Sequence, residues 1–326
     1  MTARHRLRLL ALLAGLLAAP LAGAQSFPSR PLTIVVPWPP GAATDTTTRI
    51  IAEALSKELG QPVTVENRPG ANGAIGSTQV ATGPKDGYRL ITATADTHSI
   101  NPQVRKGLGY DATKDFEPIA LYATLSMVWM ARPDLPHATM ADVLSAARQK
   151  PGSVSFGSWG IGSTAHLAGA LLEAATGVDL NHVPFQGAAP ASTALLGGHI
   201  DLLPGSAATS ANLRGSGKVR ILGIAGPRRA GGALADVPTL AEQGIRGAES
   251  GSWYGLMAPR GIPEEARLKL VAAVSKVLAS TEIRDRINAT GLDFSFAAGA
   301  DFQDFLRRQY ETYGRAIRTR NISLSE

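Results

Sequence analysis

The 326-residue chain contains no cysteine. It therefore has no disulfide, no thiolate metal ligand, no cysteine nucleophile and no lipobox cysteine for a lipid anchor. Aromatic residues make up only 6% of the chain, and Lys and Arg are scattered without a basic run. A nucleic-acid partner is therefore not expected. After the N-terminus no apolar run has the length of a membrane helix, so we expect a soluble mature chain.

The first 24 residues have the pattern of a secretory signal peptide. Arg4, Arg6 and Arg8 form a basic segment, residues 9–17 an apolar one, and Ala22-Gly23-Ala24 a small-residue cleavage site. We predict cleavage after Ala24, which lowers the formal charge from +6 to +3 (6 − 3). An exported chain without cysteine is typical of a bacterial-type periplasm.

The stretch from residue 32 to residue 59 reads as strand, loop and helix. Residues 32–36 are apolar and β-branched, residues 37–45 are rich in proline, and residues 46–59 carry an apolar helical face that ends at Gly60. Thr44 or Asp45 is the predicted N-cap. A helix that starts directly after a buried strand presents free N–H groups, which suit a carboxylate or phosphate. The alternative is that Thr44 and Asp45 only cap the helix.

Strands and helices continue to alternate, which predicts βαβ units and parallel sheets. Strands are expected at 62–66 and 89–94, with a small-residue helix at 73–82. Ligands bind beyond the carboxyl ends of such strands, so loops 37–45 and 94–98 are expected to lie side by side. Asp96, Thr97 and His98 are therefore candidate site residues, although His98 fits equally well as a packed structural residue.

A second αβ set follows Pro133. It contains predicted helices at 139–150, 165–176 and 189–196, and predicted strands at 153–156, 178–183, 200–203 and 218–225. The stretch 116–132 is too long for an ordinary strand, and we interpret it and residues 253–258 as crossings between two domains. Helices at 263–278, 282–288 and 300–318 are expected to return to the first domain. The predicted division is a first lobe of residues 25–125 plus 252–326 and a second lobe of residues 126–251.

Residues 160–165 match G-x-G-x-x-A after a strand, as in a dinucleotide fingerprint. The acidic residue expected at the end of the next strand is missing, because Asp179 comes too early. A helix start that holds a small anion with Ser163 and Thr164 explains the segment better. No cofactor is therefore expected. The histidines show no i, i+4 pair and no H-E-x-x-H, so no metal site is expected either.

An alternative function is a secreted serine hydrolase that uses Ser158 or Ser163. No G-x-S-x-G elbow surrounds any serine, and His166 lies only three residues after Ser163. Arg68 is a further candidate for pairing with a ligand carboxylate. In its Asn-Arg-Pro-Gly loop, a structural ion pair explains Arg68 better.

Motifs spread along the whole mature chain resemble the Bug-type receptors of tripartite tricarboxylate transporters. No single motif is sufficient, but their order is specific. The matching segments are 30–41 (RPLTIVVPWPPG) with Thr44-Asp45, 60–71 (GQPVTVENRPGA), 86–88 (DGY), 97–102 (THSINP), 110–111 (YD), 114–116 (KDF), 162–167 (GSTAHL), 182–187 (HVPFQG), 196–201 (LGGHID), 236–239 (DVPT) and 253–255 (WYG).

The resemblance implies a type II-like, two-lobe periplasmic-binding-protein fold, with two Rossmann-like αβ domains joined by two crossover strands. It implies a non-enzymatic, monomeric receptor that closes on a small carboxylate and delivers it to transporter subunits in the membrane. A sensor that signals to a membrane partner is an alternative. The predicted ligand-binding residues are Trp38, Gly41, Ala42, Ala43, Thr44, Asp45, Asp96, Thr97, His98, Ser158, Gly162, Ser163, Thr164, Gln186, Gly187 and Ala188.

The chain departs from the family pattern at three places. Ala42 replaces a second glycine in the first loop, Ala194 replaces an acidic residue, and Pro204-Gly205-Ser206 replaces Phe-Asp-Asn. An alanine at a position that requires positive φ is strained, so the first loop is expected to differ. These departures affect the expected ligand rather than the expected fold.

Overall fold

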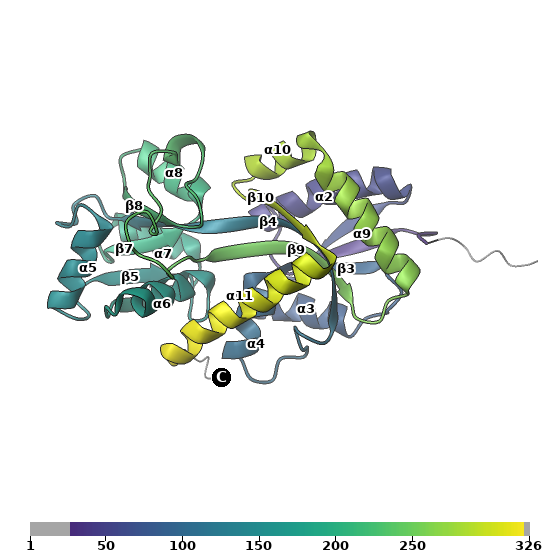
Figure 1. The fold of residues 1–326 in the computed structure, drawn as a ribbon, viewed down its shortest axis with the longest axis horizontal. Helices are drawn as coiled ribbons and strands as arrows, with labels where there is room; N and C mark the ends of the chain where they lie inside the picture. The colour runs from purple at the N-terminus through teal and green to yellow at the C-terminus, as the bar shows by residue number, and fades with distance from the viewer. Residues whose placement is uncertain (1–26, 323–326) are drawn as a thin grey trace, which may run out of the picture.

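The computed structural model describes residues 27–322, so the predicted signal peptide lies outside the described residues. The chain forms two α/β lobes connected by long strands (Figure 1). This is the two-lobe α/β architecture predicted from the sequence. No helix among residues 27–322 has the length and apolarity needed to cross a membrane.

The first lobe starts with a parallel sheet, as the alternating pattern predicted. The strands β1, β2 and β3 pair in the order β2-β1-β3, with Ile34 opposite Val65 on one side and Leu90 on the other. Ile34 and Leu90 are fully buried, because helices cover this part of the sheet. The elements of this part are β1 (Leu32–Val36), α2 (Ala43–Leu59), β2 (Val63–Asn67), η1 (Ala71–Gly73), α3 (Ala74–Ala81), β3 (Arg89–Thr94), η2 (Asp96–Ile100) and α4 (Asn101–Val104).

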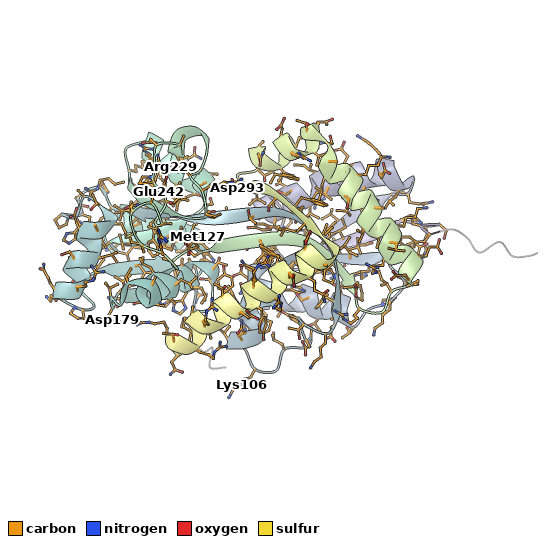
Figure 2. The ribbon with its side chains drawn as sticks, in the orientation of Figure 1. Lys106, Met127, Asp179, Arg229, Glu242 and Asp293 are labelled. Carbon is orange, nitrogen blue, oxygen red and sulfur yellow. The ribbon has the colours of Figure 1, made fainter. Side chains whose placement is uncertain are left out.

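The segment predicted to cross between domains is one 16-residue strand, β4 (Phe116–Ala131). It pairs antiparallel with β9 (Gly251–Pro259) up to the pair Ser126 and Gly251. From Met127 onward its partner is β8 (Arg220–Ala225), and from Val128 also β7 (Leu202–Gly205). Figure 2 places Met127 at this change of partners, in the strands that join the two lobes.

The second lobe contains α5 (Met140–Gln149), β5 (Ser155–Ser158), α6 (Thr164–Thr176), β6 (Asn181–Pro184), α7 (Ala188–Leu196), α8 (Ala207–Gly215), β8 and η3 (Gly232–Leu234). Here β5 pairs in parallel with β6 and β7. Helix α8 is not predicted from the sequence, since its segment is short and has a weak apolar face. Its start is fixed by Ser206, whose hydroxyl accepts a hydrogen bond from the Thr209 N–H.

The helices after β9 pack mainly on the first lobe. Leu270 and Val274 of α9 (Glu264–Ala279) share a buried cluster with Ile51 and Leu55 of α2. The helices α10 (Thr281–Ala289) and α11 (Gly299–Thr319) follow the predicted ranges closely. The strand β10 (Asp293–Ala298) was not predicted; it exists because it pairs antiparallel with β4. In Figure 1, α11 lies across the strands that connect the lobes.

Candidate functional site

The first-lobe loop ends at a helix that has no side-chain cap. Helix α2 begins at Ala43 and its N-cap is Ala42, so the prediction of Thr44 or Asp45 as N-cap is wrong. Ala42 has an ordinary extended conformation, with φ of −71°. The left-handed residue is Gly41, with φ of +84°. The alanine that replaces the family's second glycine is therefore unstrained, and the first N–H groups of α2 have no capping side chain.

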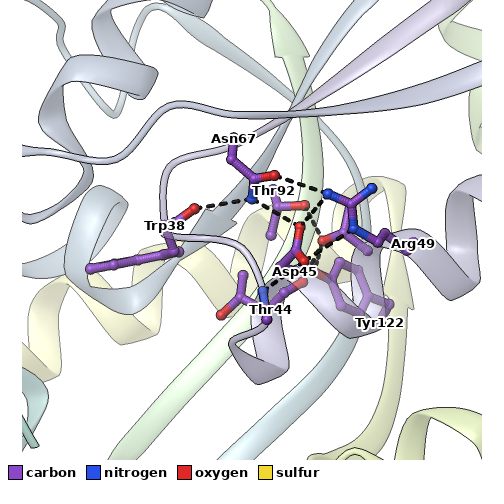
Figure 3. Close-up of polar contacts among 9 residues, drawn as sticks. Trp38, Thr44, Asp45, Arg49, Asn67, Thr92 and Tyr122 are labelled. Atoms are coloured by element: carbon purple, nitrogen blue, oxygen red, sulfur yellow. Dashed lines mark hydrogen bonds and ion pairs between the residues drawn. The ribbon is translucent and has the colours of Figure 1, made fainter.

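The Asp45 carboxylate holds the loop in place instead of capping the helix (Figure 3). It accepts hydrogen bonds from Gly41 N–H at 2.9 Å, from Asn67 Nδ2 at 2.8 Å and from Arg49 Nε at 3.1 Å. Asn67 also donates to the Trp38 carbonyl at 3.1 Å. Burial raises the pKa of Asp45, but these hydrogen bonds and the Arg49 charge outweigh it and hold the pKa below its usual value.

The loops after β1 and β3 lie side by side, as predicted. Gly73, with φ of +83°, lies between them, since a Cβ at this position would be 3.3 Å from Pro37 Cβ and 2.5 Å from Thr97 Cγ2. The Thr97 hydroxyl accepts a hydrogen bond from Thr94 N–H at 3.0 Å. Thr97 is thus used to form the turn after β3.

Of the two alternatives for His98, the geometry matches the packed residue. Its ring meets Phe116 edge to face, with 4.5 Å between ring centroids, and its Nδ1 lies 2.8 Å from the Thr97 hydroxyl. Burial lowers the pKa of His98 to about 3, so the ring is neutral. His98 also lines a cavity of about 480 Å³ beneath α11, which no other predicted site residue lines.

Asp96, in the turn after β3, lies close to the start of α6. This carboxyl group is only 7% exposed, and the Thr164 N–H at the start of α6 and the Asn72 side chain lie close enough to lower its pKa. Burial has the larger effect and raises the pKa of Asp96 to about 6. The structure therefore places the turn after β3 against the start of α6, the second predicted anion-binding helix terminus.

The start of α6 is capped, unlike the start of α2. Ser163 is the N-cap, and its hydroxyl accepts from His166 N–H at 3.3 Å and donates to the Gly160 carbonyl at 2.7 Å. Gly162 N–H donates to His166 Nδ1 at 3.1 Å. Because the Ser163 proton and the Gly162, Ser163 and His166 N–H groups are used within the loop, the Thr164 hydroxyl is the side-chain group left for a ligand at this helix start.

Ser158 is held in a similar way. Its hydroxyl lies 2.7 Å from His182 Nε2 and 3.1 Å from the Gly160 carbonyl, and the residue is fully buried. A serine nucleophile needs access to a substrate carbonyl. Neither Ser158 nor Ser163 has this access in the observed arrangement.

The remaining predicted residues lie toward the surface. Gly41, Ala42, Gln186 and Ala188 are exposed, and Trp38, Ala43 and Gly187 are half-buried. The other two departures from the family pattern have local structural roles. Ala194 is buried in a small apolar cluster, and Ser206 is the cap of α8.

Two residues near the candidate site, Tyr254 and Asn72, are not among those predicted from the sequence. Tyr254 of β9 is 8% exposed, and burial, followed by the Asp96 charge, raises its pKa. Asn72, in the left-handed region with φ of 52°, faces Asp96. Tyr254 belongs to the Trp-Tyr-Gly motif, and Asn72 lies in the loop after the Asn-Arg-Pro-Gly motif. Their places in or beside these family motifs are the features of the sequence that could have identified them as site residues.

A second cavity, of about 980 Å³, lies among β10, α6, α11 and the strands that join the lobes. None of the predicted site residues lines it, so it is separate from the candidate site. Within residues 27–322 no group of three or more His, Asp or Glu side chains is arranged to hold a metal ion.

The chain is similar to known receptors over most of its length. Residues 47–322 match the model of the tripartite tricarboxylate transporter family receptor. Protein BugT of Bordetella pertussis is 30% identical over 313 residues, which cover 94% of each chain. A protein of R. palustris solved with adipate is 32% identical, with a TM-score of 0.79 over 91% of this chain and 99% of that one.

A second solved structure, MatC of Rhodopseudomonas palustris with bound malate, is 32% identical with a TM-score of 0.75; the match covers 89% of this chain and 100% of MatC. The family match spans well over half of the chain, and it agrees with the order of motifs read from the sequence. The chain therefore belongs to the receptor family of the tripartite tricarboxylate transporters.

Proposed function

We propose that this protein is a periplasmic solute receptor that binds a small carboxylate between its lobes and delivers it to a tripartite tricarboxylate-type membrane transporter. The observation that carries this proposal is the meeting of two helix starts at one buried place. The loop that leads into α2 lies beside the turn after β3, and Asp96 of that turn faces the start of α6. Solved relatives that hold adipate and malate support the ligand class.

In this proposal one ligand carboxylate lies at the uncapped start of α2. Its partners are the N–H groups of Ala43, Thr44 and Asp45 and the hydroxyls of Thr44 and Tyr254. The helix dipole and free N–H groups favour negative charge there. The other end of the ligand lies toward Thr164, with Gln186, Gly187 and Ala188 at the rim. Asp45, Ser158, Ser163 and Thr97 shape the surrounding loops through the hydrogen bonds described above.

Ligand entry requires the lobes to separate, because Thr44, Asp96 and Thr164 are buried. The strand β4 changes partners between Ser126 and Met127, and β9 starts opposite this point. We place the hinge here and divide the chain into residues 25–125 plus 252–326 and residues 126–251. A ligand that contacts both lobes only in the closed state shifts the population toward closure.

The receptor is proposed to be exported to the periplasm and to act as a monomer with transporter subunits as partners. The mature chain is expected to begin at Gln25. Mass measurement of the protein from a periplasmic extract tests this expectation. A mass that includes residues 1–24 contradicts it.

A thermal-shift screen of the mature chain against mono-, di- and tricarboxylates tests the receptor function. A bound ligand raises the stability by RT ln(1 + [L]/Kd), so a true ligand gives a saturable rise in Tm. The variant Thr44→Val combined with Tyr254→Phe is expected to reduce the affinity at least tenfold. Thr46→Val, an exposed change two residues further along the same helix, serves as the control.

Two further assays separate the two other functions. A hydrolase releases acid from ester or amide probes, and Ser158→Ala or Ser163→Ala abolishes that release. A sensor binds its ligand as a receptor does but is retained by a different membrane partner in a pull-down. If the folded protein shows no Tm shift with any carboxylate or amino acid, the receptor function is wrong.

A further inference from the structure

Asp96 has an unused hydrogen-bonding capacity inside the proposed site. The residue is only 7% exposed, and its Oδ1 is buried and has no hydrogen-bond partner. The ion pairs formed among residues 27–322 include none with Asp96. Buried carboxylates are normally paired or hydrogen-bonded, so an unpartnered one in a binding site indicates a missing partner.

The groups around Asp96 do not supply a positive charge. Those that affect its pKa are the Thr164 N–H, its own N–H and the Asn72 side chain, and none belongs to Lys, Arg or His. The neighbouring tyrosines Tyr254 and Tyr313 are neutral, since burial and the Asp96 charge raise their pKa values. The carboxylate is therefore stabilised only by partial charges.

Asp96 also changes what the start of α6 can hold. Its carboxyl group lies beside the Thr164 N–H, where the positive end of the helix dipole favours an anion. A second ligand carboxylate at this place would lie close to Asp96, and two like charges in a buried site repel strongly. An ammonium group has the opposite effect, because it offers donors to Oδ1 and neutralises the charge.

We propose that Asp96 is a specificity-determining residue that accepts a hydrogen bond from an ammonium group of the ligand. The receptor then selects a small amino acid, with its carboxylate at the start of α2 and its ammonium group at Asp96, over a dicarboxylate of similar size. This inference rests on the proposed receptor function. It distinguishes this chain from the two relatives solved with adipate and malate, neither of which carries an ammonium group.

The test uses pairs of ligands that differ only in the amino group. Calorimetric titration of the mature chain, freed of co-purified ligand by unfolding and refolding, compares alanine with propionate, aspartate with succinate and glutamate with glutarate. In the pair that fits the site, the amino acid is expected to bind at least tenfold more tightly. Asp96→Asn is expected to remove this preference and to leave or improve the binding of the acid without the amino group.

Asp293→Asn is the matched control, because Asp293 is another partly buried carboxyl group whose pKa burial raises, and it lies in β10 outside the proposed site. This variant is expected to keep the wild-type preference. If Asp96→Asn does not fold, the wild-type ratio within each pair still decides the question, and Asp96→Ser provides a second variant.

The two proposals fail in different ways. Equal or tighter binding of propionate, succinate or glutarate by the wild-type protein overturns the role of Asp96 but supports the receptor function. An amino-acid preference that survives in Asp96→Asn also overturns that role. Absence of binding to every acid and amino acid by folded protein overturns both.

Discussion

The rings of His166 and His182 stack almost parallel, with 3.9 Å between their centroids and 7° between their planes. His182 Nε2 lies 2.7 Å from the Ser158 hydroxyl, and His166 Nδ1 accepts a hydrogen bond from Gly162 N–H. The pair thus joins α6 to β6 beneath the loop that starts α6. Two charged imidazoles at this distance repel each other, so the arrangement disfavours protonation of both rings.

The stability of the protein is therefore expected to fall as the pH falls below about 6.5, the ordinary histidine pKa. Burial lowers the pKa of His166 to about 4. Burial lowers the pKa of His182 to about 3, and the His166 charge lowers the pKa of His182 further in the same direction. Between these values and 6.5 the unfolded chain binds protons that the folded chain does not, so the folded state loses stability. Urea unfolding at pH 8, 6.5 and 5 measures this loss.

Replacing both histidines by Asn should flatten this pH dependence by up to about one proton per histidine. His199→Asn is the control, since His199 is exposed. An unchanged pH dependence in the double variant would show that other groups dominate in this range.

Asp45→Ala is expected to destabilise the protein by about 2 kcal/mol or more, because it removes a charged acceptor shared by Gly41, Asn67 and Arg49. Arg49→Ala removes only the half-exposed partner and is expected to cost less than about 1 kcal/mol. Chemical denaturation of the two variants measures both values. Equal losses would mean that Asp45 acts only through the ion pair.

Ser163→Ala is expected to lower the unfolding free energy by about 1 kcal/mol, because the N-cap of α6 is lost. Ser206→Ala removes the equivalent cap of α8 at a half-buried position and is expected to give a loss of similar size. Thermal and urea unfolding compare the two variants. In titrations only Ser163→Ala is expected to affect the ligand, and an effect of Ser206→Ala on binding would contradict the proposed site.

Gly73→Ala is expected to destabilise the protein by about 2–3 kcal/mol. The backbone at residue 73 is in the left-handed region, which disfavours a side chain, and the added methyl group also meets Thr97 and Pro37. Gly60→Ala, at the left-handed end of α2 with open space around it, isolates the conformational part and is expected to cost about 1 kcal/mol. The difference in unfolding free energy measures the crowding between the two loops. If Gly60→Ala costs as much as Gly73→Ala, the contact with Thr97 contributes nothing.

Local pattern predicted most of the elements. Residues 89–94 were recognised as a strand with the observed bounds, and α9 and α11 were placed within one residue at each end, because apolar periodicity and stop signals are local. Helix α8 and strand β10 were missed. The first has a weak apolar face, and the second is a strand only because β4 offers a free edge for pairing.

The sequence by itself determined the family, the alternation of strands and helices and the end of the first helix at Gly60, since these depend on residue types and spacing along the chain. Only the tertiary structure decided which candidate residues have free groups. Asp45, Thr97, Ser158 and Ser163 are engaged by partners, whereas Asp96 keeps an unpartnered oxygen beside α6. Asp96 and Thr164 are 68 positions apart (164 − 96), and their meeting depends on how the lobes close. Burial and hydrogen bonding are properties of the packed chain, and a linear pattern does not contain them.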